Sequence, residues 1–206
     1  MGAAPQPARR AVTVMQAALG FRVKSGWATA VLLAGPARAP RVVDRRVIEL
    51  SDPAVPTSRQ PYHAVMGASR ANGAKIEKRL RRVVERVTRQ SVRQLLQEYR
   101  KTGHPVRRVA LVVGSEIDPA RIANDHIRAH ALEGRLFRTV LEQACRSLGL
   151  KSSVLIERNA YPAGATVFRR SQAQLKQAVT ELGRAIDGPW RADEKTAALA
   201  AWMTLR

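Results

Sequence analysis

The sequence predicts an α/β fold in which a mixed sheet is covered by helices, and two observations lead to this prediction. First, apolar segments of strand length alternate along the chain with longer segments whose apolar side chains recur at helical spacing. Second, 206 residues of which 45% are apolar are enough for one domain with a buried core. We therefore expect a single α/β domain over residues 11–206.

The amino-terminal quarter is predicted to hold a tail, a hairpin and a long loop. Residues 1–10 are rich in proline and alanine and end in two arginines, which is typical of a disordered basic tail. Residues 19–33 are predicted to form a strand because Trp27, Thr29, Val31 and Leu33 occupy alternate positions, as side chains on one face of a strand do. Residues 41–50 form a second strand, and the short loop between the two predicts a hairpin. Residues 51–73 contain three prolines and two glycines and are predicted to be a long loop.

The rest of the chain is predicted to alternate between helices and strands. Residues 74–101 carry one apolar stripe at helical spacing, and residues 108–114 are a continuous apolar segment typical of a buried strand. Asp118 and Pro119 are typical of a helix start, and this second helix is expected to extend to Leu148. The remaining predicted elements are a strand at 154–157, a short strand at 167–168, a helix from Ser171 to Ile186, and a last helix at 192–205.

The chain is arginine-rich and carries a large excess of positive charge. It contains 36 basic residues, 29 of them arginine, against 16 acidic residues, so its net charge is +20. A surface that repels itself in this way is stabilised by a polyanion, and guanidinium groups pair with phosphate oxygens. We therefore expect nucleic acid, either DNA or RNA, as the partner. Other protein subunits are a further candidate partner.

Other partners and compartments are less consistent with the sequence. No apolar run approaches the roughly 20 residues that cross a bilayer, so we predict no membrane span. Cys145 is the single cysteine, which excludes an internal disulfide and favours the reducing cytoplasm. No dinucleotide-binding or phosphate-binding glycine motif is present, and the sequence identifies no cofactor.

The positive charge is concentrated in the predicted helix that follows the long loop. Residues 75–101 hold ten basic and three acidic side chains, whereas residues 116–146 hold five of each. Such a helix can be an ordinary solvated face, but the total charge favours a nucleic-acid-binding surface. Because no base-reading motif is present, we expect recognition of backbone and shape. The predicted contacts are Arg22, Lys24, Lys75, Lys78, Arg79, Arg82, Arg86, Arg89 and Arg93.

The second predicted helix contains a cluster of titratable residues on its apolar face. His126, His130 and Glu133 are spaced i, i+4 and i+7, so they lie on the side that also carries core residues. Buried polar groups need partners, and a His–Glu network that fixes helix packing is one interpretation. A catalytic or anion-handling cluster and a metal site remain alternatives, although the HExxH motif of zinc proteases is absent. We expect the cluster to be contiguous and largely buried, and to face the sheet or the 51–73 loop.

Two further residues are candidates for the same chemistry. His63 lies in the long loop, from which it could join the cluster. Glu116 follows the glycine and serine that end the 108–114 strand, where α/β proteins place functional groups, although it could equally favour the dipole of the next helix. The candidate catalytic residues are therefore His126, His130, Glu133 and Glu116.

Two segments resemble the ribonuclease H-like superfamily, in particular its RuvC-like Holliday-junction resolvases and their YqgF-like relatives. GFRVKSGWATAVLL at 20–33 is similar to the first strand and turn of that superfamily, and ADEKTAALAAW at 192–202 is similar to its last helix. The resemblance implies an RNase H-like fold and a two-metal nuclease site at Arg22, Glu116 and Glu194 (or Asp193). An arginine stands at the first of these positions, so the resemblance implies a degenerate site, as in a pseudo-nuclease.

The residues and the resemblance together predict a nucleic-acid-binding protein on an RNase H-like scaffold, without standard two-metal nuclease chemistry. Two alternatives remain open. One is an enzyme that acts on nucleic acid or another phosphorylated substrate through His126, His130 and Glu133. The other is a basic structural subunit of a larger nucleoprotein assembly.

Overall fold

The computed structural model describes residues 16–205 and contains a five-stranded mixed sheet in the order β3-β2-β1-β4-β5. Strands β1, β2 and β3 form an antiparallel meander, and β4 and β5 run parallel to β1. The strands are β1 (Ala17–Val23), β2 (Trp27–Ala34), β3 (Arg41–Glu49), β4 (Arg108–Val113) and β5 (Lys151–Ile156). The predicted fold class, a mixed sheet with flanking helices, is confirmed.

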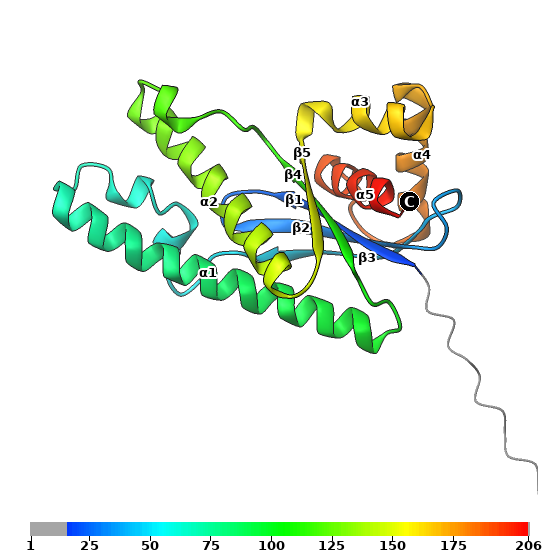
Figure 1. Cartoon of the computed structure of the whole chain (residues 1–206), viewed down its shortest axis with the longest axis horizontal. Helices are drawn as coiled ribbons and strands as arrows, with labels where there is room; N and C mark the ends of the chain where they lie inside the picture. Colours follow the sequence, from blue (N-terminus) through cyan, green and yellow to red (C-terminus); the bar gives the residue numbers. More distant parts are fainter. Residues whose placement is uncertain (1–15, 206) are drawn as a thin grey trace, which may run out of the picture.

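The helices cover both faces of the sheet and make a three-layer molecule (Figure 1). One face packs against α1 (Arg70–Lys101) and α2 (Asp125–Ser147). The other face packs against α5 (Ala192–Thr204), and α3 (Glu157–Phe168) and α4 (Gln172–Leu182) pack outside it. Short 3₁₀ turns lie at Pro56–Arg59, His63–Val65, Pro119–Arg121 and Gly183–Ala185.

The inner strands are buried on both faces, which explains why their sequences are continuous apolar segments. Every residue of β1 is buried: Phe21 packs in the core formed with α1 and α2, and Ala18 in the core formed with α5. Leu111 and Val112 of β4 point to opposite faces and both are completely inaccessible to solvent. The prediction of a buried strand at 108–114 is therefore confirmed.

The prediction of one strand at 19–33 was wrong, because this segment forms two strands, β1 and β2. A tight turn at Gly26, whose φ is +89°, separates β1 from β2, and the backbone N–H of Lys24 donates to the carbonyl of Trp27 at 2.9 Å. The φ value lies in the left-handed region, which glycine adopts without steric cost. Apolar side chains continue on both sides of the turn, so periodicity alone did not reveal it.

The predicted helix at 118–148 begins later than expected. Pro119–Arg121 forms a 3₁₀ turn, and the α2 helix begins at Asp125, where the Asn124 side chain accepts a hydrogen bond from the backbone N–H of Ile127 at 3.0 Å. Other boundaries also differ: α1 begins at Arg70, β5 begins at Lys151, and α4 ends at Leu182. The prediction of a tail at residues 1–10 lies outside the described residues.

Helix α3 was missed, and the predicted strand at 167–168 is wrong because these residues end this helix. Pro162 and Gly164 lie inside α3, and both residues argue against a helix in sequence. Gly164 lies against Leu175 of α4 and Leu199 of α5, at a distance that leaves no room for a larger side chain. Tertiary packing therefore outweighs local propensity in α3. In the described part of the chain, no helix is long and apolar enough to cross a membrane.

Candidate functional site

The carboxyl ends of three parallel strands, β1, β4 and β5, meet at one edge of the sheet, which is where α/β proteins commonly bind ligands. A pocket of about 410 Å³ opens at this edge, between the ends of β1 and β4 and the first half of α2. Seven titratable side chains line it: Arg22, Lys24, Glu116, Asp118, His130, Arg135 and Arg138. The strand ends therefore bring together residues that are far apart in the sequence.

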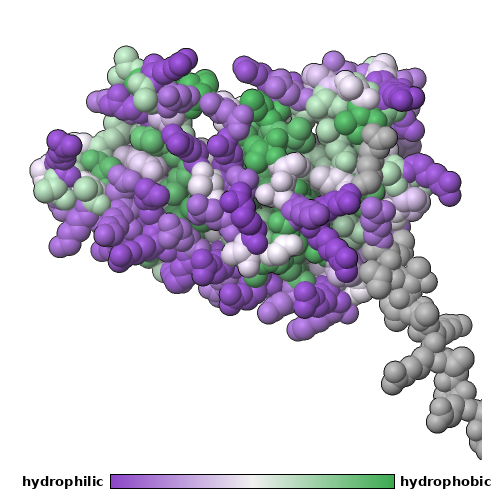
Figure 2. All heavy atoms as spheres, in the orientation of Figure 1, coloured by the Kyte–Doolittle hydropathy of each residue, from purple (hydrophilic) through white to green (hydrophobic). Residues whose placement is uncertain are grey.

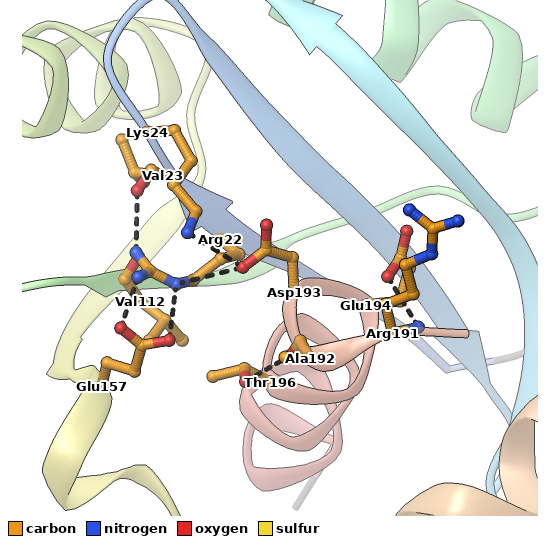
Figure 3. A network of polar contacts seen from close by, with 10 residues as sticks. All are labelled: Arg22, Val23, Lys24, Val112, Glu157, Arg191, Ala192, Asp193, Glu194 and Thr196. Atoms are coloured by element: carbon orange, nitrogen blue, oxygen red, sulfur yellow. Dashed lines mark hydrogen bonds and ion pairs between the residues drawn. The ribbon is translucent and has the colours of Figure 1, made fainter. Parts of the chain in front are cut away.

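Arg22 occupies the centre of this edge and is only 4% exposed (Figure 3). Its guanidinium forms a bidentate pair with the carboxylate of Glu157, the residue directly after β5, and Nε donates to Oε1 at 3.1 Å. Nη1 also donates to the carbonyl of Val23 at 2.8 Å. Bidentate guanidinium–carboxylate pairs are among the stronger charged hydrogen bonds, so Arg22 is held in place by β5 as well as by its own strand.

Asp193, in the first turn of α5, completes the network. Its Oδ1 lies 3.7 Å from Arg22 Nε and 3.1 Å from Lys24 Nζ (Figure 3). Two cations and two carboxylates therefore balance one another at the end of β1. We name this set, Arg22, Lys24, Glu157 and Asp193, the Arg22 network.

The Arg22 network does not fit the two-metal centre that the resemblance implies. Hard divalent cations need several free oxygen ligands, whereas both carboxylates here are already bound by a guanidinium or an ammonium group. A fixed positive charge at the centre also repels a metal ion. The residues present therefore hold an internal cation instead of a metal.

Of the positions carried over from the resemblance, Arg22 and Asp193 come together, whereas Glu116 and Glu194 do not join them. Glu116 pairs with Arg138 of α2 on the other side of the pocket. Glu194 accepts a hydrogen bond from the backbone N–H of Arg191 at 2.9 Å, so it caps α5 and turns away from Arg22 (Figure 3). Sequence reasoning missed Glu157, although it follows β5 just as Glu116 closely follows β4.

The structure brings His126, His130 and Glu133 together and adds His63 from the 3₁₀ turn in the long loop. The three imidazole rings lie 4.3 to 4.8 Å apart between centroids. The Glu133 carboxylate is completely buried and pairs with His63. Its Oε1 atom lies 2.8 Å from Nδ1 of His63 and accepts a hydrogen bond from the backbone N–H of the same residue at 3.3 Å. We name these four residues the histidine cluster.

The expectation that the histidine cluster faces the 51–73 loop is confirmed, but the expectation that it is largely buried is wrong for two of its members. His126 and His130 are exposed, because both lie on the first turns of α2, beyond the part of the helix that the sheet covers. His130 also lines the strand-end pocket. The cluster is therefore accessible from solvent on one side and closed by a buried carboxylate on the other.

A third feature is the exposed side of α1. Its buried side consists of Leu80, Val84, Val92, Leu95 and Tyr99 with two smaller residues, and basic side chains cover the other side. Figure 2 shows hydrophilic side chains gathered along the flank of the molecule where α1 lies. Six exposed residues recur at alternating spacings of four and three: Lys75, Arg79, Arg82, Arg86, Arg89 and Arg93. We name this row the cationic stripe.

The fold and the strand-end edge define the class of protein: an α/β protein with the ribonuclease H-like fold, as the resemblance implied. The sequence matches no family model and no curated protein. The structure is similar to Thermus thermophilus RuvC in complex with Holliday junction substrate, with a TM-score of 0.51, 12% identity and 91% of each chain covered.

A second Thermus thermophilus RuvC structure has a TM-score of 0.50 and 11% identity, and the match covers 91% of this chain and 92% of the other. The yeast mitochondrial Holliday junction resolvase Ydc2 has a lower TM-score of 0.43 at 10% identity, with 93% of this chain and 79% of that chain covered. At these identities the likeness is one of fold.

Proposed function

We propose that this protein binds structured nucleic acid through the cationic stripe of α1 and that its strand-end edge does not perform two-metal nuclease chemistry. The observation that carries the proposal is the stripe itself. Five of its residues, Lys75, Arg79, Arg82, Arg89 and Arg93, form no ion pair with a carboxylate in residues 16–205. Unpaired exposed guanidinium groups in a row are available to phosphate oxygens.

The length of the stripe suits a nucleic-acid backbone. Lys75 and Arg93 are 18 positions apart, which corresponds to about 27 Å along a helix that rises about 1.5 Å per residue. Phosphates on one strand of a duplex follow one another every ~3.4 Å along the axis, so the stripe spans about eight base pairs. Glutamines Gln90, Gln94 and Gln97 line a shallow groove beside the arginines and add neutral hydrogen-bonding groups.

The predicted contacts outside α1 change in the light of the structure. Arg22 is buried and paired with Glu157, so it is not one of the proposed nucleic-acid contacts. Lys24, whose side chain is 35% exposed, lies at the pocket, and it stays a proposed contact. Arg86 belongs to the stripe but pairs with Asp52 at 2.7 Å, so its role is partly to hold the long loop. We place the protein in the cytoplasm, where a free buried thiol such as Cys145 remains reduced.

The first test is charge reversal along the stripe. We expect a variant with Arg79, Arg82, Arg89 and Arg93 replaced by Glu to bind a DNA duplex, an RNA duplex or a four-way junction about 100-fold or more weakly than the unaltered protein. The slope of log affinity against log salt should fall by about 3 to 4, at ~0.9 for each lost phosphate contact. Fluorescence anisotropy at several salt concentrations measures both quantities.

The matched control places the same four reversals on the opposite layer of the molecule. Arg158, Arg169, Lys176 and Arg184 are exposed and lie in or beside α3 and α4, on the other side of the sheet. This variant has the same net charge as the first and should retain most of the affinity. Equal loss in both variants would show that net charge, and not the stripe, accounts for binding.

The second test concerns the strand-end edge. Because Arg22 and Lys24 together neutralise both carboxylates of the Arg22 network, we expect no Mg²⁺-stimulated cleavage of a four-way junction or a duplex. Labelled substrates incubated with and without Mg²⁺ give the measurement. Cleavage that requires Mg²⁺ and disappears in Glu116→Gln or Glu157→Gln would contradict the proposal.

A further inference from the structure

The histidine cluster has the composition and the geometry of a transition-metal site, and we propose that His63, His126 and His130 bind one Zn²⁺ ion, with Glu133 as the carboxylate that orients His63 and His130. This site is separate from the cationic stripe and does not depend on it. The cluster contains three of the four histidines of the chain. One imidazole nitrogen from each of the three lies within 4.8 Å of the others.

The distance between two of the candidate ligand atoms fits a zinc site. Zn²⁺ binds imidazole nitrogens at about 2.0 to 2.1 Å in a tetrahedral arrangement, which places two such nitrogens about 3.3 Å apart. The Nε2 atoms of His126 and His130 are 3.2 Å apart. Their i, i+4 spacing on α2 is the spacing with which one helix supplies two ligands to one ion.

The buried Nε2 nitrogen of His63 is a third candidate ligand atom. Its Nδ1 pairs with Glu133 at 2.8 Å, whereas its Nε2 is buried and has no hydrogen-bond partner among residues 16–205. In the neutral tautomer in which Nδ1 donates to the carboxylate, the Nε2 lone pair is free to bind a metal ion. A carboxylate that holds the far nitrogen of a ligand histidine is the usual outer partner in zinc sites.

Glu133 is positioned to orient a second histidine in the same way. Its Oε2 is also buried without a hydrogen-bond partner and lies 3.8 Å from Nδ1 of His130. A small side-chain rotation would let His130 donate from Nδ1 and present Nε2 to the ion. One buried carboxylate would then orient two of the three ligands.

The charge of the buried Glu133 carboxylate also favours a bound cation. In the described part of the chain its ion-pairing partners are the two histidines, and no lysine or arginine contacts it. A completely buried carboxylate without a cation is unfavourable. A divalent ion held by three neutral imidazoles would supply the compensating charge. Because His126 and His130 are exposed, water can take the fourth position, as in zinc sites with an open coordination position.

The test is zinc binding to the tag-free protein, stripped with a chelator and measured without nucleic acid. Titration of Zn²⁺ against a chromogenic chelator should give one tightly bound ion per chain. His126→Ala and His130→Ala should each lose this stoichiometric binding, and both are exposed positions at which the fold should tolerate alanine. His104→Ala, which removes the remaining histidine outside the cluster, is the matched control and should bind like the unaltered protein.

Two further measurements separate ligation from folding. Glu133→Gln should keep one ion per chain with an affinity about 10- to 100-fold lower, because it removes the orienting carboxylate and leaves all three ligands. Zn²⁺ should raise the melting temperature of the unaltered protein and of His104→Ala, but not that of His126→Ala. The proposal is overturned if the unaltered protein takes up no stoichiometric zinc, or if the His126 and His130 variants bind it equally well.

Discussion

Arg22 determines the charge at the strand-end edge of the sheet. Its guanidinium lies between Glu157 and Asp193, so the positive charge that balances them is covalently part of the chain. A bound metal ion can exchange ligands with a substrate, but a guanidinium has no open coordination position. At the residue scale, then, the Arg22 network links the end of β1 to the residue after β5 and to the first turn of α5.

Cys145 allows a prediction about pH at the same scale. Burial, with a smaller contribution from the Glu142 charge, raises the pKa of its thiol to about 12. In the unfolded chain the thiol ionises near pH 8.5, so above that pH the unfolded state loses a proton that the folded state keeps. The free energy of unfolding should therefore fall by about 1 kcal/mol more between pH 7.5 and 9.5 than it does in Cys145→Ala. Urea unfolding at the two pH values measures this difference.

The same burial should protect the thiol from reagents. At pH 8 a disulfide reagent should modify folded Cys145 far more slowly than the urea-unfolded chain, because the thiolate is the reactive form. Rapid modification of the folded protein, or an identical pH dependence in Cys145→Ala, would contradict the assignment.

At the scale of elements, α5 packs directly against the backbone of β1. A Cβ atom added to Gly20 would lie 1.9 Å from the carbonyl oxygen of Ala197, so the helix rests directly on the strand backbone. The alanine-rich sequence of α5 permits this approach, because small side chains let backbones come near one another. The α5 helix in turn brings Asp193 to the Arg22 network.

We expect Gly20→Ala to cost about 3 kcal/mol or more, because two backbones would have to separate. The matched substitution is Gly134→Ala in α2, where nothing lies within 4 Å of the added Cβ. It should gain up to about 1 kcal/mol, since alanine favours the helix more than glycine does. Urea unfolding of both variants gives the comparison, and a Gly20→Ala protein as stable as the unaltered one would show that α5 lies further from β1.

At the scale of the whole molecule, the positive charge is an unfavourable term in the free protein. The net charge is +20, and the stripe places unpaired arginines side by side on α1. Salt screens such repulsion, with a Debye length of about 30 Å at 0.01 M and about 8 Å at 0.15 M. Nucleic acid would remove the same repulsion by direct pairing.

The melting temperature of the free protein should therefore rise as sodium chloride increases from about 0.01 M to about 0.15 M. The stripe variant with Arg79, Arg82, Arg89 and Arg93 replaced by Glu should show a smaller rise, because each replacement lowers the net charge by two units. Differential scanning calorimetry measures both. A melting temperature that falls with salt would mean that attractive ion pairs such as Arg46 with Glu98 dominate the surface.

The sequence predicted the features whose physical cause is local or periodic. The apolar segment at 108–114, the apolar stripe of α1, and the serine that caps α4 each carry their signal within a few turns of chain. The cationic stripe was predicted for the same reason, since spacings of three and four place residues on one side of a helix. The fold class followed from the order of these elements.

Only the tertiary structure decided which distant residues meet, because proximity across a sheet is not encoded in local spacing. Helix α3 forms around Pro162 because α4 and α5 pack against it. Glu157 reaches Arg22 across 135 positions, and His63 reaches Glu133 across 70. The sequence by itself thus determined the fold class and the charged helix. The folded chain decided that Arg22 meets two carboxylates at the strand ends and that three histidines gather beside one buried carboxylate.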